Sequence, residues 1–375
     1  MDNWARVRAA DFMEFNPRLS IKKGTMATKI AMDKLQPFTK KIPEKERGAF
    51  AGGSKFCNGD TIMARITPCL ENGKTAFVDV LEDGEVAFGS TEFIVMRAKA
   101  GVSDPQFVYY LATSPAFRNV AIKSMVGSSG RQRVQQGVLD ELELTVPPLK
   151  EQQKIGAFLA SLDEKIALNN KINDNLQQQV CALFESWFVS FDQTDGEMPA
   201  DWREGTLGEL VTITSGKRPP MKQPTATVDA QIPLVGAASI MGFTNAVLYN
   251  EPILVTGRVG THGVVQRFQS PCWTSDNTLV IKSKFYEYAF QALQRVDYVN
   301  MNRGSTQPLI TQTDLKNVSI VIPTEAILLG YEKIAETLMA MYESNRKENE
   351  RLALLRDTLL PHLMNGEIDI SNIDI

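Results

Sequence analysis

Cysteine and histidine are scarce in this chain of 375 residues. The four cysteines are Cys57, Cys69, Cys181 and Cys272. They are widely spaced and include no Cys-x-x-Cys pair, which argues against a disulfide framework and against a zinc site. The two histidines, His262 and His362, have no partner at a spacing typical of metal binding or of nucleophile activation. We therefore predict unpaired thiols and no metal site.

Long apolar runs are missing as well. No run approaches the roughly 20 residues that a membrane-spanning helix needs. The first six residues, Met1 to Arg6, lack the apolar stretch of a signal peptide. We therefore expect a cytoplasmic protein with no membrane partner.

Short motifs that resemble catalytic loops lack the context that such loops require. Residues 73–75, Gly-Lys-Thr, resemble the end of a phosphate-binding loop, but Pro68 stands where that loop has glycine, so a hairpin turn is the better interpretation. The glycines of residues 257–263 lack the Gly-x-Gly-x-x-Gly spacing of a dinucleotide site. Residues 146–149, Val-Pro-Pro-Leu, lack the amide and the aromatic of an amino-methyltransferase motif. We predict that the chain is not itself an enzyme and holds no cofactor.

The chain contains an internal repeat. Residues 139–147 read Leu-Asp-Glu-Leu-Glu-Leu-Thr-Val-Pro, and residues 315–323, 176 positions later, read Leu-Lys-Asn-Val-Ser-Ile-Val-Ile-Pro. The repeat predicts two globules related by pseudo-twofold symmetry, and such an object suits a target that also has two parts. The alternative is a single enlarged core.

The repeat extends upstream more loosely. Ala64-Arg65-Ile66 corresponds to Gly257-Arg258-Val259, and residues 90–95 correspond to residues 275–280. The looser match is typical of two recognition surfaces that diverged on one scaffold.

Each copy of the repeat leads into a long helix whose seam residues recur every three or four positions. The first seam is Ile155, Leu159, Leu162, Ile166, Asn169, Asn173, Leu176, Val180, Leu183 and Trp187. The second seam, 179 positions after the corresponding residues, is Ile334, Leu338, Met341, Asn345, Glu348, Leu352, Leu355, Leu359 and His362. A helix of about 33 residues spans about 50 Å, which exceeds the width of a small domain.

Both seams are polar at the centre, where Asn169 and Asn173 stand in the first and Asn345 and Glu348 in the second. If the helices pair, these polar layers meet and fix the register. The return of the chain through the second globule favours antiparallel over parallel pairing. The alternative is two independent helices, each packed on its own globule.

The apolar patterns predict a mixed α/β fold for each globule. The predicted strands are residues 61–66, 76–80, 93–97, 142–146, 253–256, 264–268, 279–282 and 318–322. The predicted helices are residues 105–123, which Pro115 divides, and residues 285–296. Gly-rich turns lie between the strands, where recognition residues are expected. The predicted divisions are a first globule at 1–146, a first helix at 147–190, a linker and second globule at 191–322, and a second helix with a tail at 323–375.

The charge is unevenly distributed along the chain. The net charge is −4, yet residues 1–146 and residues 202–322 each carry a net charge of +3. The linker and the helices are acidic. The basic globules indicate contact with nucleic acid, although so small an excess also fits a chance fluctuation of surface charge.

Residues 58–74 read Asn-Gly-Asp-Thr-Ile-Met-Ala-Arg-Ile-Thr-Pro-Cys-Leu-Glu-Asn-Gly-Lys, residues 146–155 read Val-Pro-Pro-Leu-Lys-Glu-Gln-Gln-Lys-Ile, and residues 359–361 and 365–368 read Leu-Leu-Pro and Asn-Gly-Glu-Ile. These stretches resemble the DNA-specificity subunit of Type I restriction-modification systems, and residues 58–74 are similar to one lineage of its target-recognition domains. Residues 146–155 resemble the start of its first spacer helix, and residues 359–361 and 365–368 resemble the end of the second. The chain departs from the pattern at residues 323–327, where the second copy lacks the double proline and gains three residues.

The resemblance implies a non-catalytic reader of DNA. Each target-recognition domain would bind one half of a bipartite, asymmetric site, and the paired helices would set the spacing. The implied partners are double-stranded DNA, two modification subunits that methylate adenine, and restriction subunits that translocate and cleave, as in phage defence. S-adenosylmethionine, ATP and magnesium would belong to those partners.

Base contacts in such a reader come from Arg, Lys, Asn and Gln on loops that reach the major groove. The candidates are Arg65, Lys74, Arg131, Gln132, Arg133, Lys217, Arg218, Arg258, Arg303 and Gln307. A loop arginine contacts phosphate at least as often as it reads a base. Three other functions stay open at this point: the specificity subunit of a methylation-only or other phage-defence complex, a coiled-coil scaffold that does not bind DNA, and a nuclease or methyltransferase acting alone.

Overall fold

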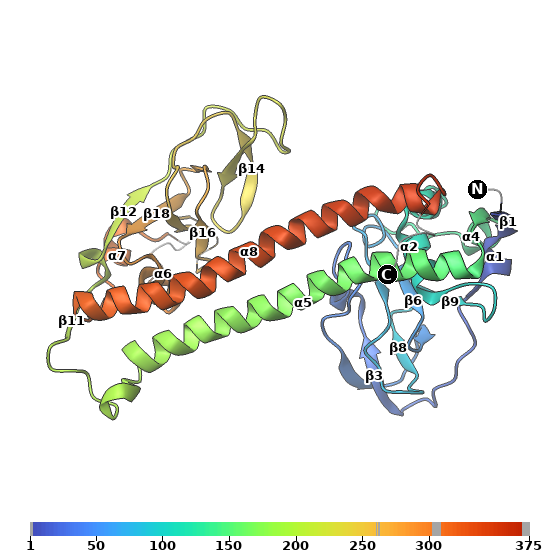
Figure 1. Cartoon of the computed structure of the whole chain (residues 1–375), viewed down its shortest axis with the longest axis horizontal. Coiled ribbons are helices and arrows are strands. Elements are labelled where there is room, and N and C mark those ends of the chain that lie inside the picture. Colours follow the sequence, from blue (N-terminus) through green and yellow to red (C-terminus); the bar gives the residue numbers. More distant parts are fainter. Residues whose placement is uncertain (1–2, 260, 262, 302–308, 370–375) are drawn as a thin grey trace. The chain divides into compact units, whose positions relative to one another are not determined.

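The computed structural model describes residues 3–259, 261, 263–301 and 309–369. The chain forms two compact units, of which one is Met1–Lys171 with Asn345–Ile375 and the other is Ile172–Ser344. Each unit contains a globule and one half of each of two long helices, α5 (Leu149–Phe188) and α8 (Glu325–Met364), drawn green and red in Figure 1. The unit boundary therefore lies inside the helices.

The globule of the first unit is built on three sheets. Their strand orders are β1-β10, β2-β9-β6-β7 and β4-β3-β8-β5. Every neighbouring pair is antiparallel except β3 and β8, which run parallel. The elements are β1 (Ala5–Arg8), α1 (Ala9–Phe12), β2 (Met13–Phe15), β3 (Met26–Ile30), the 3-10 helix η1 (Met32–Lys34), β4 (Glu46–Ala49), β5 (Lys55–Phe56), β6 (Thr61–Ala64), β7 (Thr75–Phe77), β8 (Ala87–Gly89), β9 (Phe93–Ala98), α2 (Pro105–Thr113), α3 (Pro115–Lys123), α4 (Gln136–Asp140) and β10 (Glu143–Val146).

The second unit repeats this arrangement. Its strand orders are β11-β19, β12-β18-β15-β16 and β14-β13-β17, and β13 and β17 are the parallel pair. The elements are the 3-10 helix η2 (Asp192–Thr194), β11 (Arg203–Thr206), the 3-10 helix η3 (Leu207–Glu209), β12 (Val211–Ser215), β13 (Ile232–Val235), β14 (Ile240–Thr244), β15 (Ile253–Gly257), β16 (Gln266–Phe268), β17 (Trp273–Thr274), β18 (Thr278–Ser283), α6 (Tyr286–Gln294), α7 (Gln312–Lys316) and β19 (Ser319–Ile322). The prediction of two repeated mixed α/β globules is confirmed, and the alternative of one enlarged core is wrong.

Proline and capping residues divide the helical segment after β9. The Asp104 side chain accepts a hydrogen bond from the Phe107 amide at 2.9 Å and so caps α2. The Ser114 hydroxyl accepts one from the Phe117 amide at 3.4 Å and caps α3. Pro115 occupies the first turn of α3, where its missing N–H has no intrahelical partner to lose. The predicted division at this proline is confirmed.

In the first unit, the beginning of α5 and the end of α8 share one buried core with the globule. Ile155 and Leu159 from α5 and Leu360 and Leu363 from α8 belong to the same cluster as Phe107 of α2. Early residues of one helix thus lie with late residues of the other. The two helices are therefore antiparallel in this unit, and both pack on the globule.

The second unit has the complementary arrangement. Val180 and Phe184 from the end of α5 and Leu328 and Tyr331 from the beginning of α8 share a core with Tyr288 of α6. The rings of Phe184 and Tyr288 lie 5.2 Å apart between centroids. The antiparallel pairing is confirmed, and the alternative of two helices that each pack on one globule alone is wrong. Although α5 and α8 each span 40 residues, no helix within the described ranges is long and apolar enough to cross a membrane.

The polar centres of the two helices meet as predicted. In the first unit, the Asn169 amide donates to the Glu348 carboxylate at 2.7 Å and to the Asn349 side-chain oxygen at 2.9 Å. In the second unit, the Asn173 amide donates to the Tyr342 backbone carbonyl at 3.3 Å. Both asparagines are buried. A shift by one turn would leave these buried groups unpaired, so the layer specifies the register.

The seam predicted for α5 is confirmed, because each of its ten residues is buried or half-buried. The seam predicted for α8 is displaced by one position over much of its length. Ile334, Met341 and Leu355 are 43%, 52% and 45% exposed, whereas Ala335 is buried and the Arg356 side chain is only 13% exposed. The prediction was wrong at these positions because it carried the spacing of the first seam over to α8, where Leu328, Tyr331, Leu360 and Leu363 also pack on the globules. Charged residues of α8, among them Arg356, are buried against partners.

Glu332 is a buried charged residue of this kind. Its carboxylate accepts hydrogen bonds from the backbone amides of Glu287 and Tyr288, at 3.0 and 2.8 Å, in the first turn of α6. Burial raises the pKa of Glu332 to about 7, and the nearby charge of Glu287 adds to the rise. Since this pKa is higher in the folded state than in the unfolded chain, the contribution of Glu332 to stability is largest below its unfolded pKa and is lost as pH rises toward 7.

Replacement of Glu332 tests this contact. Glu332→Leu leaves two buried amides unpaired and should lower the free energy of unfolding by about 2 kcal/mol or more. Glu332→Gln keeps a hydrogen-bond acceptor but carries no charge. Its free energy of unfolding should therefore be at least that of the original chain at pH 8, where Glu332 is ionised, and should not exceed it at pH 5, where Glu332 is protonated in the folded chain. Urea unfolding of both variants at the two pH values measures this. An equal loss for both variants would show that the amide contacts do not matter.

Candidate nucleic-acid interface

Three loops of the first globule meet at the end of strand β6. The Arg65 amide donates to the Glu92 carbonyl at 2.9 Å, and the Arg65 carbonyl accepts from the Val134 amide at 2.9 Å. The Thr67 amide donates to the Gln132 carbonyl at 3.0 Å. The loop after β6, the loop before β9 and the loop before α4 are therefore joined by backbone hydrogen bonds. We call the side chains of Arg65, Glu92, Arg131, Gln132 and Arg133 the loop junction.

A carboxylate organises the arginines of the loop junction. The Arg133 guanidinium donates from Nε to both Glu92 oxygens at 3.0 Å and from Nη2 to Oε1 at 2.7 Å. The Arg65 Nε lies 4.0 Å from the same carboxylate, and it is buried with no hydrogen-bond partner among the described residues. The hydrogen bond from Arg133 holds the pKa of Glu92 below its usual value, so this carboxylate is charged at neutral pH.

Sequence reasoning named Arg65, Gln132 and Arg133 but missed Glu92. The correspondence of residues 90–95 with residues 275–280 could have drawn attention to this position, because it places Glu92 at the start of a strand beside β6. An acidic residue is not expected on a DNA-binding surface. The search for loop Arg, Lys, Asn and Gln residues therefore did not select Glu92.

The other two candidates of the first globule differ in their surroundings. Arg131 is exposed at the tip of its loop. The Lys74 ammonium donates to the Met32 carbonyl at 2.9 Å and is half-buried. Lys74 therefore holds the loop before β7 to the rest of the globule. The predicted hairpin at residues 73–75 is confirmed, since β6 and β7 pair antiparallel on either side of it.

The second globule forms the same junction with its own residues. The Arg258 amide donates to the Asn277 carbonyl at 2.8 Å, and the Arg258 carbonyl accepts from the Ile310 amide at 3.0 Å. Arg258 thus occupies the place that Arg65 has in the first globule. Lys217 and Arg218 are exposed on the loop after β12. The remaining candidates, Arg303 and Gln307, lie outside the described residues, as does His262.

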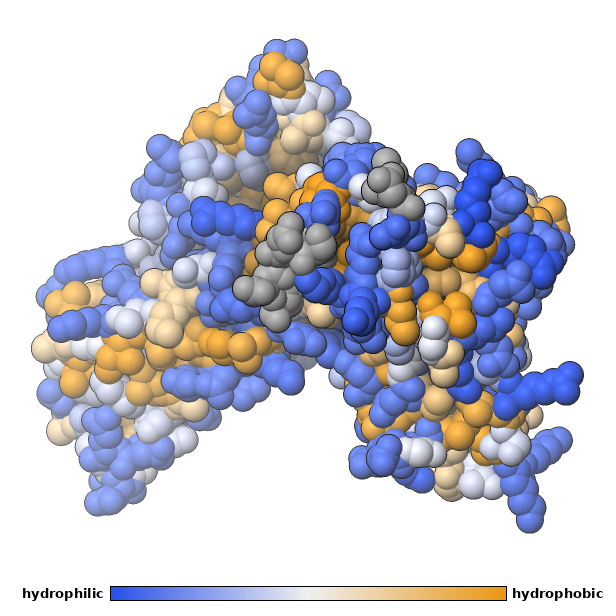
Figure 2. Space-filling model, turned by 45° about the vertical axis from the view of Figure 1, so that its right-hand side comes forward, coloured by the Kyte–Doolittle hydropathy of each residue, from blue (hydrophilic) through white to orange (hydrophobic). Residues whose placement is uncertain are grey.

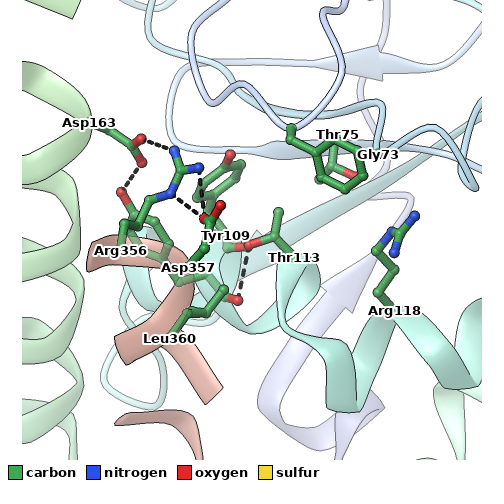
Figure 3. Close-up of a pocket in the computed structure, with 11 residues that line it drawn as sticks. Gly73, Thr75, Tyr109, Thr113, Arg118, Asp163, Arg356, Asp357 and Leu360 are labelled. Carbon is green, nitrogen blue, oxygen red and sulfur yellow. Dashed lines mark hydrogen bonds and ion pairs between the residues drawn. The ribbon is translucent and has the colours of Figure 1, made fainter. Parts of the chain in front are cut away.

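A buried network connects the first globule to both long helices. The Tyr110 hydroxyl of α2 donates to Asp163 of α5 at 2.5 Å, and Arg356 of α8 donates to the other Asp163 oxygen at 2.5 Å. Figure 3 shows Arg356 reaching from α8 toward Asp163, with Asp357 on its other side. The Lys40 ammonium lies 3.3 Å from the Tyr110 oxygen, and burial lowers the pKa of Lys40 to about 8.

This network holds three elements in one orientation. Asp163 and Arg356 have side chains only 6% and 13% exposed, so each charge depends on the other for compensation. The candidate loop junction and the network belong to the same unit. The network joins α2 of the globule to α5 and to α8. The four cysteines are free thiols, and no group of His, Cys, Asp or Glu suited to a metal ion is found among the residues that the structure describes.

The network predicts a strong and non-additive effect of mutation. Arg356→Met strands the Asp163 charge and should destabilise the first unit by about 3 kcal/mol. Adding Asp163→Leu should cost less than the sum of the single changes, because the double variant removes both charges of the Asp163–Arg356 ion pair together. Urea unfolding measures the cycle, with Arg351→Met at an exposed position of the same helix as the matched control. Additive effects would contradict the coupling.

Comparisons with known proteins agree with this architecture. The family described as "Type I restriction modification DNA specificity domain" matches residues 1–178 and again residues 199–356. The chain is 24% identical to the Type I restriction enzyme MjaIX specificity subunit of Methanocaldococcus jannaschii, over 72% of this chain and 70% of that protein. It is also 24% identical to the HindI specificity subunit of Haemophilus influenzae, over 83% and 86% of the two chains. The fold is similar to the crystal structure of the S subunit of a Type I restriction-modification system from M. genitalium, with a TM-score of 0.59, 18% identity and 96% of each chain covered.

Proposed function

Because this chain belongs to the family of Type I restriction modification DNA specificity domains, we propose that it reads DNA sequence for a Type I restriction-modification complex. In this proposal each globule binds one half of a bipartite, asymmetric site. The chain recognises DNA and does not catalyse. S-adenosylmethionine, ATP and magnesium are then bound by the partner subunits.

The equivalent placement of Arg65 and Arg258 carries this proposal. Arg65 directly follows the central strand β6, and Arg258 directly follows the central strand β15. In each case the backbone amide and the backbone carbonyl of the arginine form hydrogen bonds with two further loops. Two copies of one scaffold thus present the same type of side chain where three loops meet. Arginine matches the acceptor edge of guanine and also binds phosphate, so a repeated loop arginine suits a DNA target with two half-sites.

We assign DNA contact to the loop residues in both globules. They are Arg65, Arg131, Gln132, Arg133, Lys217, Arg218 and Arg258, together with Arg303 and Gln307. Lys74 supports the first set by anchoring its loop to the Met32 carbonyl. Loops on a rigid sheet are suited to this role, because the scaffold stays constant while the reading residues vary.

The exposed apolar side chains of the helices are the proposed docking surface for two modification subunits. In the first unit they are Leu168, Leu354 and Leu355, and in the second unit they are Ile172, Leu329, Ile334 and Met341. In this proposal the Leu355 side chain contacts a modification subunit and does not belong to the interface between α5 and α8. Figure 2 shows apolar side chains reaching the surface among hydrophilic ones. Restriction subunits would join the complex that the modification subunits form.

A domain exchange tests the proposal of two readers. Residues 1–146 are replaced by the corresponding segment of a relative, and the methylated bases are sequenced in DNA from cells that also carry the modification subunits. Only one half of the methylated sequence should change, because each globule has its own core. A change in both halves, or methylation without any sequence preference, would contradict the proposal.

The spacing of the half-sites can be tested at the unit boundary. One heptad is inserted between Lys171 and Ile172 and another between Ser344 and Asn345, so that the contacts inside each unit are preserved. This adds about 10 Å to the antiparallel pair, or about three base pairs of DNA rise. We expect the same half-sites with a spacer longer by one to three pairs and with reduced affinity, because DNA twist turns the second half-site around the axis.

The control for this test carries the heptad in α5 alone, which should break the pairing and abolish methylation. If the doubly extended protein methylated sites with the original spacer, the helices would not determine the distance.

A further inference from the structure

The contact between Glu92 and Arg133 leaves one edge of the guanidinium available. An arginine side chain carries five N–H donors in a planar fork. Glu92 takes one from Nε and one from Nη2, both on the same side of the fork. The Nη1 nitrogen lies 3.5 Å from the Arg131 carbonyl, at the limit of a hydrogen bond. One N–H on each terminal nitrogen remains, and such a pair matches O6 and N7 of guanine.

The Arg133 side chain is also accessible. It is 44% exposed, while the carboxylate that holds it is 24% exposed. The carboxylate thus lies deeper than the guanidinium. An arginine held in this way loses little rotamer freedom when it binds a base, because its orientation is already fixed.

A carboxylate is unfavourable on a surface that must approach phosphates. Glu92 stands among Arg65, Arg131 and Arg133, and it lowers the positive charge of the loop junction by one. Its presence therefore weakens general attraction to DNA. This cost is understandable if the carboxylate increases discrimination between bases.

The second globule shows that the fold does not require this ion pair. Asn277 stands where the first globule has Glu92, and Leu309 pairs with the strand end as Arg133 does in the first globule. Two backbone hydrogen bonds of the junction, those on the amide and the carbonyl of Arg65 and of Arg258, are nevertheless the same. At these two equivalent positions, the first globule thus has both the carboxylate and the arginine, and the second globule has neither.

We propose that Glu92 is a positioning residue that holds Arg133 for reading a guanine in the half-site of the first globule. This inference rests on the proposed function. The second globule, with Asn277 and Leu309 at these places, reads its own half-site without this contact.

Glu92→Gln tests the inference in the complete complex of this chain with its modification subunits. The control is Glu71→Gln, which removes an exposed carboxylate from the loop before β7 of the same globule. Base preference is measured by binding to a DNA library that is randomised over both half-sites, and Arg133→Gln identifies the base pair that Arg133 reads. We expect Glu92→Gln to reduce guanine preference at that pair about tenfold. Affinity for DNA of any sequence should rise, because a negative charge is removed.

A loss of folding would lower the affinity of the complex for every DNA sequence. Higher affinity for DNA of any sequence, together with a weaker preference for guanine, therefore indicates that Glu92 positions Arg133. Unchanged preference for the second half-site confirms that the variant is folded. If Glu92→Gln kept the guanine preference that Arg133→Gln loses, or if Arg133→Gln weakened binding to all sequences equally, the inference would be overturned. If the unmodified complex had no base preference at all, the proposed function itself would fail.

Discussion

Each unit depends on the burial of one half of α5 against the opposite half of α8 and against a helix of its own globule. In the first unit α2 supplies that third helix, and in the second unit α6 supplies it. Residues of α5, of α8 and of the globule share one core in each unit, so the helices and the globule are stabilised together. As a consequence, each globule that presents candidate recognition loops is packed on both helices.

Polar groups give this apolar packing its direction. Asn169 bonds across the helix pair, and Asp163 and Arg356 neutralise each other below the globule. Glu332 plays a corresponding part in the second unit by accepting the amides of α6. Hydrophobic burial is non-directional, whereas a buried polar group tolerates only a geometry that satisfies it. The register of the helices and the orientation of the globule therefore rest on a few hydrogen bonds.

The two globules share a scaffold but differ in the side chains of the loop junction. Their strand orders correspond, except that the third sheet has four strands in the first globule and three in the described part of the second. Two backbone hydrogen bonds of the junction are the same in both copies, while the side chains differ: Glu92 with Arg133 in one, Asn277 with Leu309 in the other. A scaffold whose loop junction is held by backbone hydrogen bonds can change these side chains without losing its fold. In the proposed function, two globules of one architecture would in this way read half-sites of different sequence.

The sequence by itself determined the repeat, the fold class, the two long helices and their polar centres, because these features depend on local periodicity and capping. It also identified Arg65 and Arg258 as equivalent. Only the tertiary structure decided which face of α8 is buried and which residues surround the arginines. The reason is that a pattern assigns charged residues to the solvent, whereas Arg356 and Glu332 are buried by partners distant in the chain, and Glu92 meets Arg133 across 41 positions. Such compensation between distant charges leaves no periodic signal.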